Sequence, residues 1–167
     1  QEEAKKLGIF VLPMPFYIDG ECYYESVTLS RELFFEKLTS GADISTSQPS
    51  PTAVMEIWDK ALEEYEKILY MPISSGLSSS YNTAMMLAQE EKYEGRVLVV
   101  DDGQVAAPLH QMILDTLDMI EKGYEAEHIR ELLEKAGDRM MIYIALQTLE
   151  FLKKGGRVTP AAAALGS

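Results

Sequence analysis

The sequence contains very few of the residues that stabilise small proteins through disulfides or bound metals. Its 167 residues include one cysteine, Cys22, and two histidines, His110 and His128. A single cysteine cannot form an internal disulfide and cannot supply a multi-cysteine zinc site, which is typical of proteins in a reducing compartment. We therefore expect a cytoplasmic protein.

Positive charge is also scarce. The chain has 15 basic and 27 acidic residues, which gives a formal net charge of −12. Nucleic acids and anionic membranes are bound mainly through basic surfaces, so this balance argues against both as partners. No apolar run approaches the ~20 residues that a membrane-spanning helix needs. The sequence thus predicts no nucleic-acid partner and no membrane span.

Apolar residues, in contrast, are abundant at 47 %, which is enough for a sizeable core in one domain, or in one domain and part of a second. From residue 51 onward, short apolar runs alternate with amphipathic segments. Strand-like runs fall at 68–73, 97–100 and 140–145, and helical patterns at 51–65, 80–91, 105–120, 129–136 and 149–154. This alternation predicts an α/β fold, in which the three runs are neighbouring parallel strands flanked by helices.

The first fifty residues show a different pattern. Asp19-Gly20 separates the β-prone residues 9–18 from residues 21–24, which is a strong hairpin signal. Thr28 is a candidate N-cap for a helix that runs to about residue 38. Ser50 followed by Pro51 is a favourable N-cap and first-turn pair for the next helix.

Five serines occupy the seven positions 74–80, between a predicted strand and a predicted helix. Hydroxyls and backbone N–H groups at a helix N-terminus stabilise an anion, both as donors and through the helix dipole. Serine also caps helices and forms turns, and a single serine would be enough for that. Five of them favour a polar binding site.

Two other polar loops are expected close to this serine loop. Ligands of open α/β sheets bind at the carboxyl ends of the strands, where Asp101-Asp102-Gly103 is also expected. Thr46-Ser47-Gln48 leads into a helix of the same layer, so three loops are predicted to converge on one crevice. The two aspartates are possible Mg²⁺ ligands. We expect them instead to cap the next helix and to fix the loop, without a divalent cation.

Motifs for catalysis are incomplete. A serine hydrolase needs a base beside its nucleophile, but His110 and His128 both lie in helical patterns far from the strand ends. Residues 76–80 have serine where the Gly-x-Ser-x-Gly motif has its second glycine. No lysine follows the glycine as it does in a phosphate-binding loop. A phosphotransferase or esterase that uses residues 74–80 is the alternative to a binding protein.

Four segments resemble motifs of the DegV family of bacterial fatty-acid-binding proteins. Residues 45–50, Ser-Thr-Ser-Gln-Pro-Ser, are similar to its Thr-Ser-Gln-Pro-Ser motif. Residues 73–78, Ile-Ser-Ser-Gly-Leu-Ser, resemble its Ser-Ser-x-Leu-Ser-Gly-Thr-Tyr segment. Residues 99–102 are similar to its strand that ends in Asp-Ser, and residues 152–158 to its Leu-x-x-Gly-Gly-Arg-Ile/Val segment. The four occur in the family's order along essentially the whole chain.

The resemblance implies a protein that binds a long-chain fatty acid and has no catalytic residue, no metal and no cofactor other than this ligand. In the family, the threonine before Ser-Gln and the serine after Leu hold the carboxylate. It also implies a partner, a separate fatty-acid kinase subunit that makes the acyl phosphate. The candidate ligand-binding residues are Thr46, Ser78, Ser47, Ser75, Ser79 and Arg157.

The same resemblance implies how the chain is divided. Residues 1–153 would form the first α/β domain of the DegV type, and residues 154–167 the start of a truncated second domain that buries the acyl chain. The family's usual first strand and its Asp-Ser-x-x-Asp-Leu-Pro segment do not precede Gln1, and a large C-terminal part does not follow Ser167. We therefore expect a fragment of a longer protein.

Overall fold

The computed structural model describes residues 2–24, 27–145 and 148–159. The chain forms two compact units. Unit 1 contains the residues up to Leu12 together with Pro49–Ile142, and unit 2 contains Pro13–Gln48 together with the residues from Tyr143 onward. The predicted domain boundary after residue 153 stays a prediction, because most of residues 154–167 lie outside the described residues.

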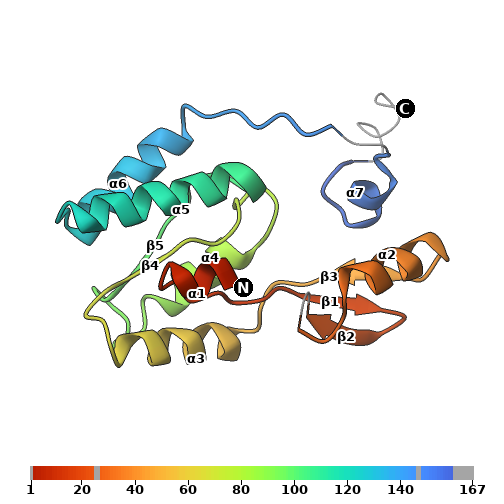
Figure 1. The fold of residues 1–167 in the computed structure, drawn as a ribbon, viewed down its shortest axis with the longest axis horizontal. Coiled ribbons are helices and arrows are strands. Elements are labelled where there is room, and N and C mark those ends of the chain that lie inside the picture. The colour runs from red at the N-terminus through yellow and green to blue at the C-terminus, as the bar shows by residue number, and fades with distance from the viewer. Residues whose placement is uncertain (1, 25–26, 146–147, 160–167) are drawn as a thin grey trace. The chain divides into compact units, whose positions relative to one another are not determined.

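Unit 1 is the α/β part of the chain (Figure 1). Its elements are α1 (Glu2–Lys6), α3 (Pro51–Leu62), β4 (Ile68–Tyr70), α4 (Ser80–Leu87), β5 (Val97–Val99), α5 (Ala106–Glu121) and α6 (Ala126–Gly137). Strands β4 and β5 are parallel, with Ile68 opposite Val97 and Tyr70 opposite Val99. This confirms the predicted α/β class with a parallel sheet and flanking helices.

Helices cover both faces of the β4–β5 pair. Successive side chains of a strand point to opposite faces, so Tyr70 and Leu69 enter different cores. Tyr70 packs against the cluster that contains Trp58 of α3 and Ala84 of α4. Leu69 packs against the cluster formed with α5 and α6. Because both faces are covered, all three residues of β5 are buried, as is usual for a parallel strand.

Unit 2 is built on an antiparallel sheet. Its elements are β1 (Pro15–Ile18), β2 (Glu21–Tyr24), α2 (Arg31–Thr39), β3 (Ile44–Thr46) and α7 (Glu150–Lys154), and the strand order is β2-β1-β3. Asp19 and Gly20 connect β1 to β2 with φ angles of 51° and 87°. Positive φ at both central residues is what a tight two-residue hairpin requires, and the predicted hairpin is confirmed.

The predicted strand at residues 140–145 is wrong. These residues form no strand, and Met141 and Tyr143 are 74 % and 88 % exposed. The boundary between the two units falls within this segment, after Ile142. A strand needs a hydrogen-bonded neighbour, and an apolar run alone does not show whether one is within reach. Among the described residues the parallel sheet therefore has two strands instead of three.

Two predicted N-caps had different outcomes. Ser50 caps α3, since its side chain accepts the Ala53 N–H at 3.2 Å, and Pro51 opens the helix as expected. Thr28 does not cap α2. Its hydroxyl accepts the Tyr24 N–H at 2.8 Å, and Ser30 is the N-cap of that helix. Thr28 and Ser30 both precede α2, and the conformation of the local turn determines which of them is the N-cap.

Candidate functional site

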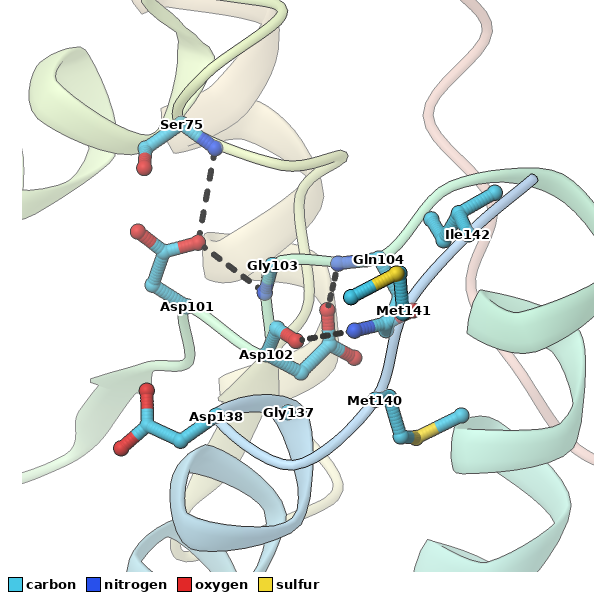
Figure 2. A pocket seen from close by; sticks show the side chains of 10 residues that line it. All are labelled: Ser75, Asp101, Asp102, Gly103, Gln104, Gly137, Asp138, Met140, Met141 and Ile142. Carbon is cyan, nitrogen blue, oxygen red and sulfur yellow. Dashed lines mark hydrogen bonds between the residues drawn. The ribbon is translucent and has the colours of Figure 1, made fainter. Parts of the chain in front are cut away.

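The serine loop, residues 74–80, leaves the carboxyl end of β4 and lies beside the loop that follows β5. The Ser74 N–H donates to the carbonyl oxygen of Gln104 at 2.9 Å. The Ser75 N–H donates to Asp101 Oδ1 at 3.4 Å (Figure 2). Two of the three polar loops predicted to converge therefore lie together at one edge of the sheet, because parallel strands end at the same edge.

A tight turn places the Ser78 hydroxyl at the N-terminus of α4. The carbonyl of Ser74 accepts the N–H groups of Leu77 at 2.9 Å and Ser78 at 3.2 Å. Ser78 Oγ accepts the Ser80 N–H at 3.2 Å and lies 2.7 Å from Ser80 Oγ. A hydroxyl has one proton and two acceptor lone pairs. If Ser80 donates its proton to Ser78, both lone pairs of Ser78 are used and its own proton remains available for a ligand.

The other two serine candidates of this loop are exposed. Ser75 is exposed and donates its backbone N–H to Asp101. Ser79 is the N-cap residue of α4, but its side chain makes no capping hydrogen bond. Its carbonyl accepts the Thr83 N–H at 3.0 Å. Capping alone therefore does not account for the serines at positions 75 and 79.

The remaining candidates belong to unit 2. Thr46 is the exposed last residue of β3 and pairs with Phe16 of β1. The Ser47 N–H donates to the carbonyl of Pro15 at 3.1 Å, and its hydroxyl donates to the carbonyl of Gln48 at 3.2 Å. Arg157 Nη1 donates to the carbonyl of Gly155 at 2.7 Å. The convergence of Thr46 and Ser47 with the serine loop of unit 1 stays a prediction.

A pocket of about 390 Å³ opens beside the serine loop (Figure 2). Its lining combines three carboxyl groups with three large apolar side chains. The lining residues are Ser75, Asp101, Asp102, Gly103, Gln104, Gly137, Asp138, Met140, Met141 and Ile142. Like charges repel in a partly desolvated site, so this pocket disfavours a carboxylate. Of the candidate residues, Ser75 lines it.

Two buried polar residues form the floor of this pocket. Asp102 and Gln104 are each 2 % exposed. Asp102 Oδ1 accepts the Gln104 N–H at 2.9 Å, and Gln104 Nε2 donates to the Asp102 carbonyl at 2.9 Å. Burial raises the pKa of the Asp102 carboxyl, while the Gln104 N–H opposes that rise. Sequence reasoning missed Gln104, although its place two residues after Asp102 is typical of an aspartate-centred turn.

The prediction for the two aspartates was half right. Asp101 Oδ1 accepts the N–H groups of Ser75 and Gly103, so fixation of the loop is confirmed. Helix capping is wrong: α5 begins at Ala106, and its N-cap residue, Val105, has no side-chain hydrogen bond. Within residues 2–24, 27–145 and 148–159, no group of His, Cys, Asp or Glu side chains is arranged to hold a metal ion.

Both histidines are engaged with other side chains. His110 Nε2 lies 3.1 Å from Glu3 Oε1. The His128 ring stacks on Tyr124 with the ring centroids 5.6 Å apart. The side-chain partner of the Ser78 hydroxyl is the Ser80 hydroxyl, at 2.7 Å. This arrangement supplies donors for an anion, and it does not pair a serine with a histidine base.

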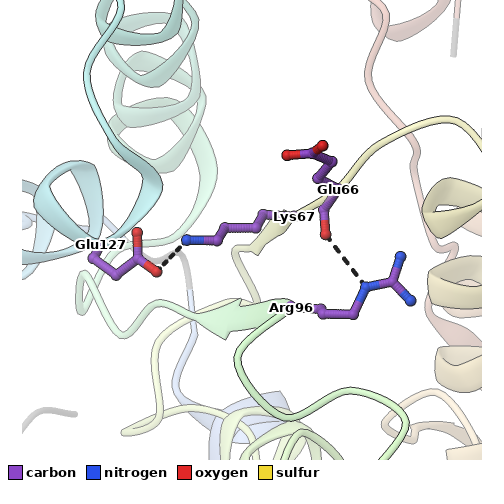
Figure 3. A network of polar contacts seen from close by, with 4 residues as sticks. All are labelled: Glu66, Lys67, Arg96 and Glu127. Atoms are coloured by element: carbon purple, nitrogen blue, oxygen red, sulfur yellow. Dashed lines mark hydrogen bonds and ion pairs between the residues drawn. The ribbon is translucent and has the colours of Figure 1, made fainter.

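The opposite edge of the sheet, at the amino ends of β4 and β5, carries a charged network (Figure 3). Lys67 pairs with Glu127 at the start of α6. Arg96 Nε donates to the carbonyl of Glu66 at 3.4 Å. The side chains of Lys67 and Glu127 are 40 % and 50 % exposed, and exposed pairs contribute little to stability.

Among the described helices none is long and apolar enough to cross a membrane.

Comparison with known proteins gives a consistent result over the full length of the chain. Residues 1–167 match a family model described as an uncharacterised protein of the DegV family. A DegV domain-containing protein of Deinococcus radiodurans is 32 % identical over 166 residues, which cover 99 % of this chain and 58 % of that protein. The chain therefore spans less than two thirds of the length of this relative.

Solved structures show the same likeness. A DegV family protein from Thermus thermophilus, described as fatty-acid binding, superposes with a TM-score of 0.88 at 33 % identity. The match covers 100 % of this chain and 59 % of that one. A stearic-acid-binding protein from Eubacterium ventriosum shares the fold, with a TM-score of 0.83 at 24 % identity over 100 % of this chain and 59 % of that one.

Proposed function

The chain belongs to the DegV family, and we propose that it is part of a protein that binds one long-chain fatty acid without catalysing a reaction on it. The observation that carries the proposal is the serine loop, whose turn holds the Ser78 hydroxyl at the N-terminus of α4. The fatty-acid binding described for the Thermus thermophilus relative, at 33 % identity, supports the same ligand class.

The head group of the acid is a carboxylate, and it needs donors at fixed positions. The N–H and the hydroxyl of Ser80 both donate to Ser78 Oγ and occupy its two lone pairs. The Ser78 hydroxyl then donates its own hydrogen to the carboxylate. The first N–H groups of α4 have no acceptor inside the helix, and the helix dipole favours an anion there. No metal and no other cofactor is needed for this interaction.

The family motifs supply the rest of the proposed site. Thr46, in the segment that resembles Thr-Ser-Gln-Pro-Ser, is the second hydroxyl donor to the carboxylate. Ser47, Ser75 and Ser79 belong to the two loops around the head group, and Arg157 lies near the mouth of the fatty-acid site. A separate fatty-acid kinase subunit phosphorylates the presented carboxylate. The engagement of His110 with Glu3 and of His128 with Tyr124 supports a binding role over the alternative of an esterase or phosphotransferase.

Ser78→Ala and Thr46→Ala, made in the full-length protein, test the head-group site. A hydrogen bond to a charged group contributes about 1.5–3 kcal/mol, so each variant should bind the acid roughly 10- to 150-fold more weakly. Weak binding should remain, because each buried CH₂ contributes about 0.8 kcal/mol. Phosphorylation by the kinase should suffer more, since it needs a positioned carboxylate. Ser40→Ala, at an exposed serine of unit 2, is the matched control.

Fatty-acid affinity and kinase-coupled turnover are measured for the three variants and for Ser78→Ala/Thr46→Ala. If both hydroxyls hold one carboxylate, the double variant should lose less affinity than the sum of the two single losses in free energy. Unchanged affinity and turnover in both single variants would show that the head group binds elsewhere. The ligand class is tested by mass spectrometry of an organic extract from the purified protein. An extract that contains no fatty acid would contradict it.

A further inference from the structure

The backbone of the serine loop is tied to the turn formed by residues 101–104, here called the 101–104 turn. The Ser74 N–H donates to the carbonyl of Gln104 at 2.9 Å. The carbonyl of the same Ser74 accepts the Ser78 N–H at 3.2 Å. The position of Ser78 is therefore connected to Gln104 through one residue, Ser74.

The 101–104 turn is itself closed by two residues. The N–H and the side-chain amide of Gln104 both bond to Asp102, one to its carboxylate and one to its carbonyl, and each bond is 2.9 Å long. Both residues are 2 % exposed, so water competes little for these bonds. Gly103 between them has a φ of 68°, a conformation that glycine adopts without strain.

Helix α6 closes the space behind this turn. A Cβ added to Gly137, the last residue of α6, would lie 2.1 Å from the carbonyl oxygen of Asp102 and 2.7 Å from its carbonyl carbon. The two backbones are thus in direct contact (Figure 2). Because cores are close-packed, Asp102 has no room to move towards α6.

We infer that Asp102 and Gln104 are positioning residues for the head-group site: they hold the 101–104 turn in the shape that fixes Ser74 and, through it, the Ser78 hydroxyl. The inference rests on the proposed function of Ser78. Neither residue donates to the ligand. Their effect reaches it through the backbone bonds between the 101–104 turn and the serine loop, chiefly the two hydrogen bonds of Ser74.

A positioning role has a distinct signature in binding. A hydrogen bond to a carboxylate weakens steeply with distance and angle, whereas the contacts of the acyl chain are non-directional. A displaced Ser78 should therefore reduce affinity for the acid and leave affinity for the fatty alcohol of the same chain length nearly unchanged. The readout is the ratio of these two affinities, which a general loss of stability does not change.

Two variants break the 101–104 turn and two serve as controls. Gln104→Met keeps the length of the side chain but removes the bond to the Asp102 carbonyl, and Asp102→Ala removes the acceptor for the Gln104 N–H. Asp102→Asn retains an oxygen acceptor and is the conservative rescue. Ile129→Val, in the α6 core of the same unit, is a packing change that removes no hydrogen bond of the turn. All are made in the full-length protein, and thermal unfolding first identifies those that fold.

The acid-to-alcohol affinity ratio should fall about tenfold in Gln104→Met and Asp102→Ala, which is within the range of one hydrogen bond to a charged group. It should stay within about twofold of the natural ratio in Asp102→Asn and Ile129→Val. If Asp102→Ala does not fold, Gln104→Met decides, because it buries a side chain of similar size.

Ser78→Ala separates this inference from the proposed function. If the natural protein binds acid and alcohol equally well, or Ser78→Ala leaves the ratio unchanged, the proposed head-group site fails. If Ser78→Ala lowers the ratio while Gln104→Met leaves it at the natural value, the head-group site stands and the positioning role of Asp102 and Gln104 is wrong.

Discussion

The serine loop of unit 1 and the Thr46-Ser47 segment of unit 2 follow strands in two different kinds of sheet. The serine loop leaves a parallel strand, so the loop after the neighbouring strand ends at the same edge and supplies acceptors to Ser74 and Ser75. Thr46 ends a three-residue strand of an antiparallel sheet and is held by its pairing with Phe16. Hydrogen bonds between two loops therefore hold the serine loop in place, whereas pairing between two strands holds Thr46.

The cores beneath the two segments also differ. Unit 1 has two buried clusters, one on each face of the β4–β5 pair. Among its described residues, unit 2 has one cluster of buried residues, Phe16, Ile18 and Leu29, with partly buried neighbours around it. The segment that carries Thr46 therefore depends on a few apolar side chains, whereas the serine loop depends on backbone hydrogen bonds above a larger core. Four predictions test this difference, the first three in order of decreasing effect.

Phe16→Ala should have the largest effect. Phe16 is 5 % exposed, packs against Phe34 and lies directly opposite Thr46. Truncating a buried phenylalanine typically costs about 3–5 kcal/mol in the free energy of unfolding. Hydrogen exchange should accelerate in β1–β3 while the amides of β5 keep their protection. An equal loss of protection in β5 would show that the two units do not have separate cores.

Gly137→Ala should act in the opposite unit with a smaller effect. Alanine favours a helix over glycine by about 1 kcal/mol, but the added methyl would overlap the backbone of Asp102. Overpacking of this kind typically costs about 1–3 kcal/mol, so the clash should win and unfolding should become easier. Gly76→Ala is the control, since its methyl would lie 3.6 Å from Ser74 Oγ, an ordinary contact. Stability equal to or above that of the natural protein in Gly137→Ala would refute the close approach.

A matched pair of N-cap variants compares the units at the same type of contact. Ser50 accepts the Ala53 N–H at 3.2 Å in unit 1, and Ser30 accepts the Leu33 N–H at 3.3 Å in unit 2. Replacing either serine with alanine should cost about 1 kcal/mol. Urea unfolding measures this loss, and hydrogen exchange locates it. Exchange should become faster in α3 for Ser50→Ala and in α2 for Ser30→Ala. Exchange that accelerates in the other unit instead would contradict the separation.

Tyr93 gives the last test, in which the expected signature is a change in the pH dependence of stability. Burial raises the pKa of Tyr93 from its ordinary value of 10.0 to about 12, together with the hydrogen bond that the Tyr93 hydroxyl donates to the Asp59 carboxylate. The folded state therefore binds its proton more tightly than the unfolded state. This stabilisation is complete below pH 10 and is lost as the pH rises towards 12. Tyr93→Phe should show a flatter decline of unfolding free energy over that range, and an identical decline would contradict the assignment.

The position of the serine loop could be predicted from the sequence because the signals for it are local. The apolar run before residue 74 and the helical spacing after residue 80 place the serine loop at the carboxyl end of β4 without any knowledge of distant residues. The same holds for the hairpin at Asp19-Gly20 and for the cap of α3 at Ser50. Each depends on backbone preferences within a few positions along the chain.

Other features depend on residues that are distant in sequence, and only the tertiary structure decided them. Residues 140–145 are as apolar as β5, but no described strand lies beside them to accept their hydrogen bonds. Nothing near Gly137 in sequence shows that Asp102 touches it. Gln104 and Ser74 are likewise joined across two strand ends. Periodicity identifies the elements, whereas the packing of the elements determines which loops meet, since close approach is a property of the folded chain as a whole.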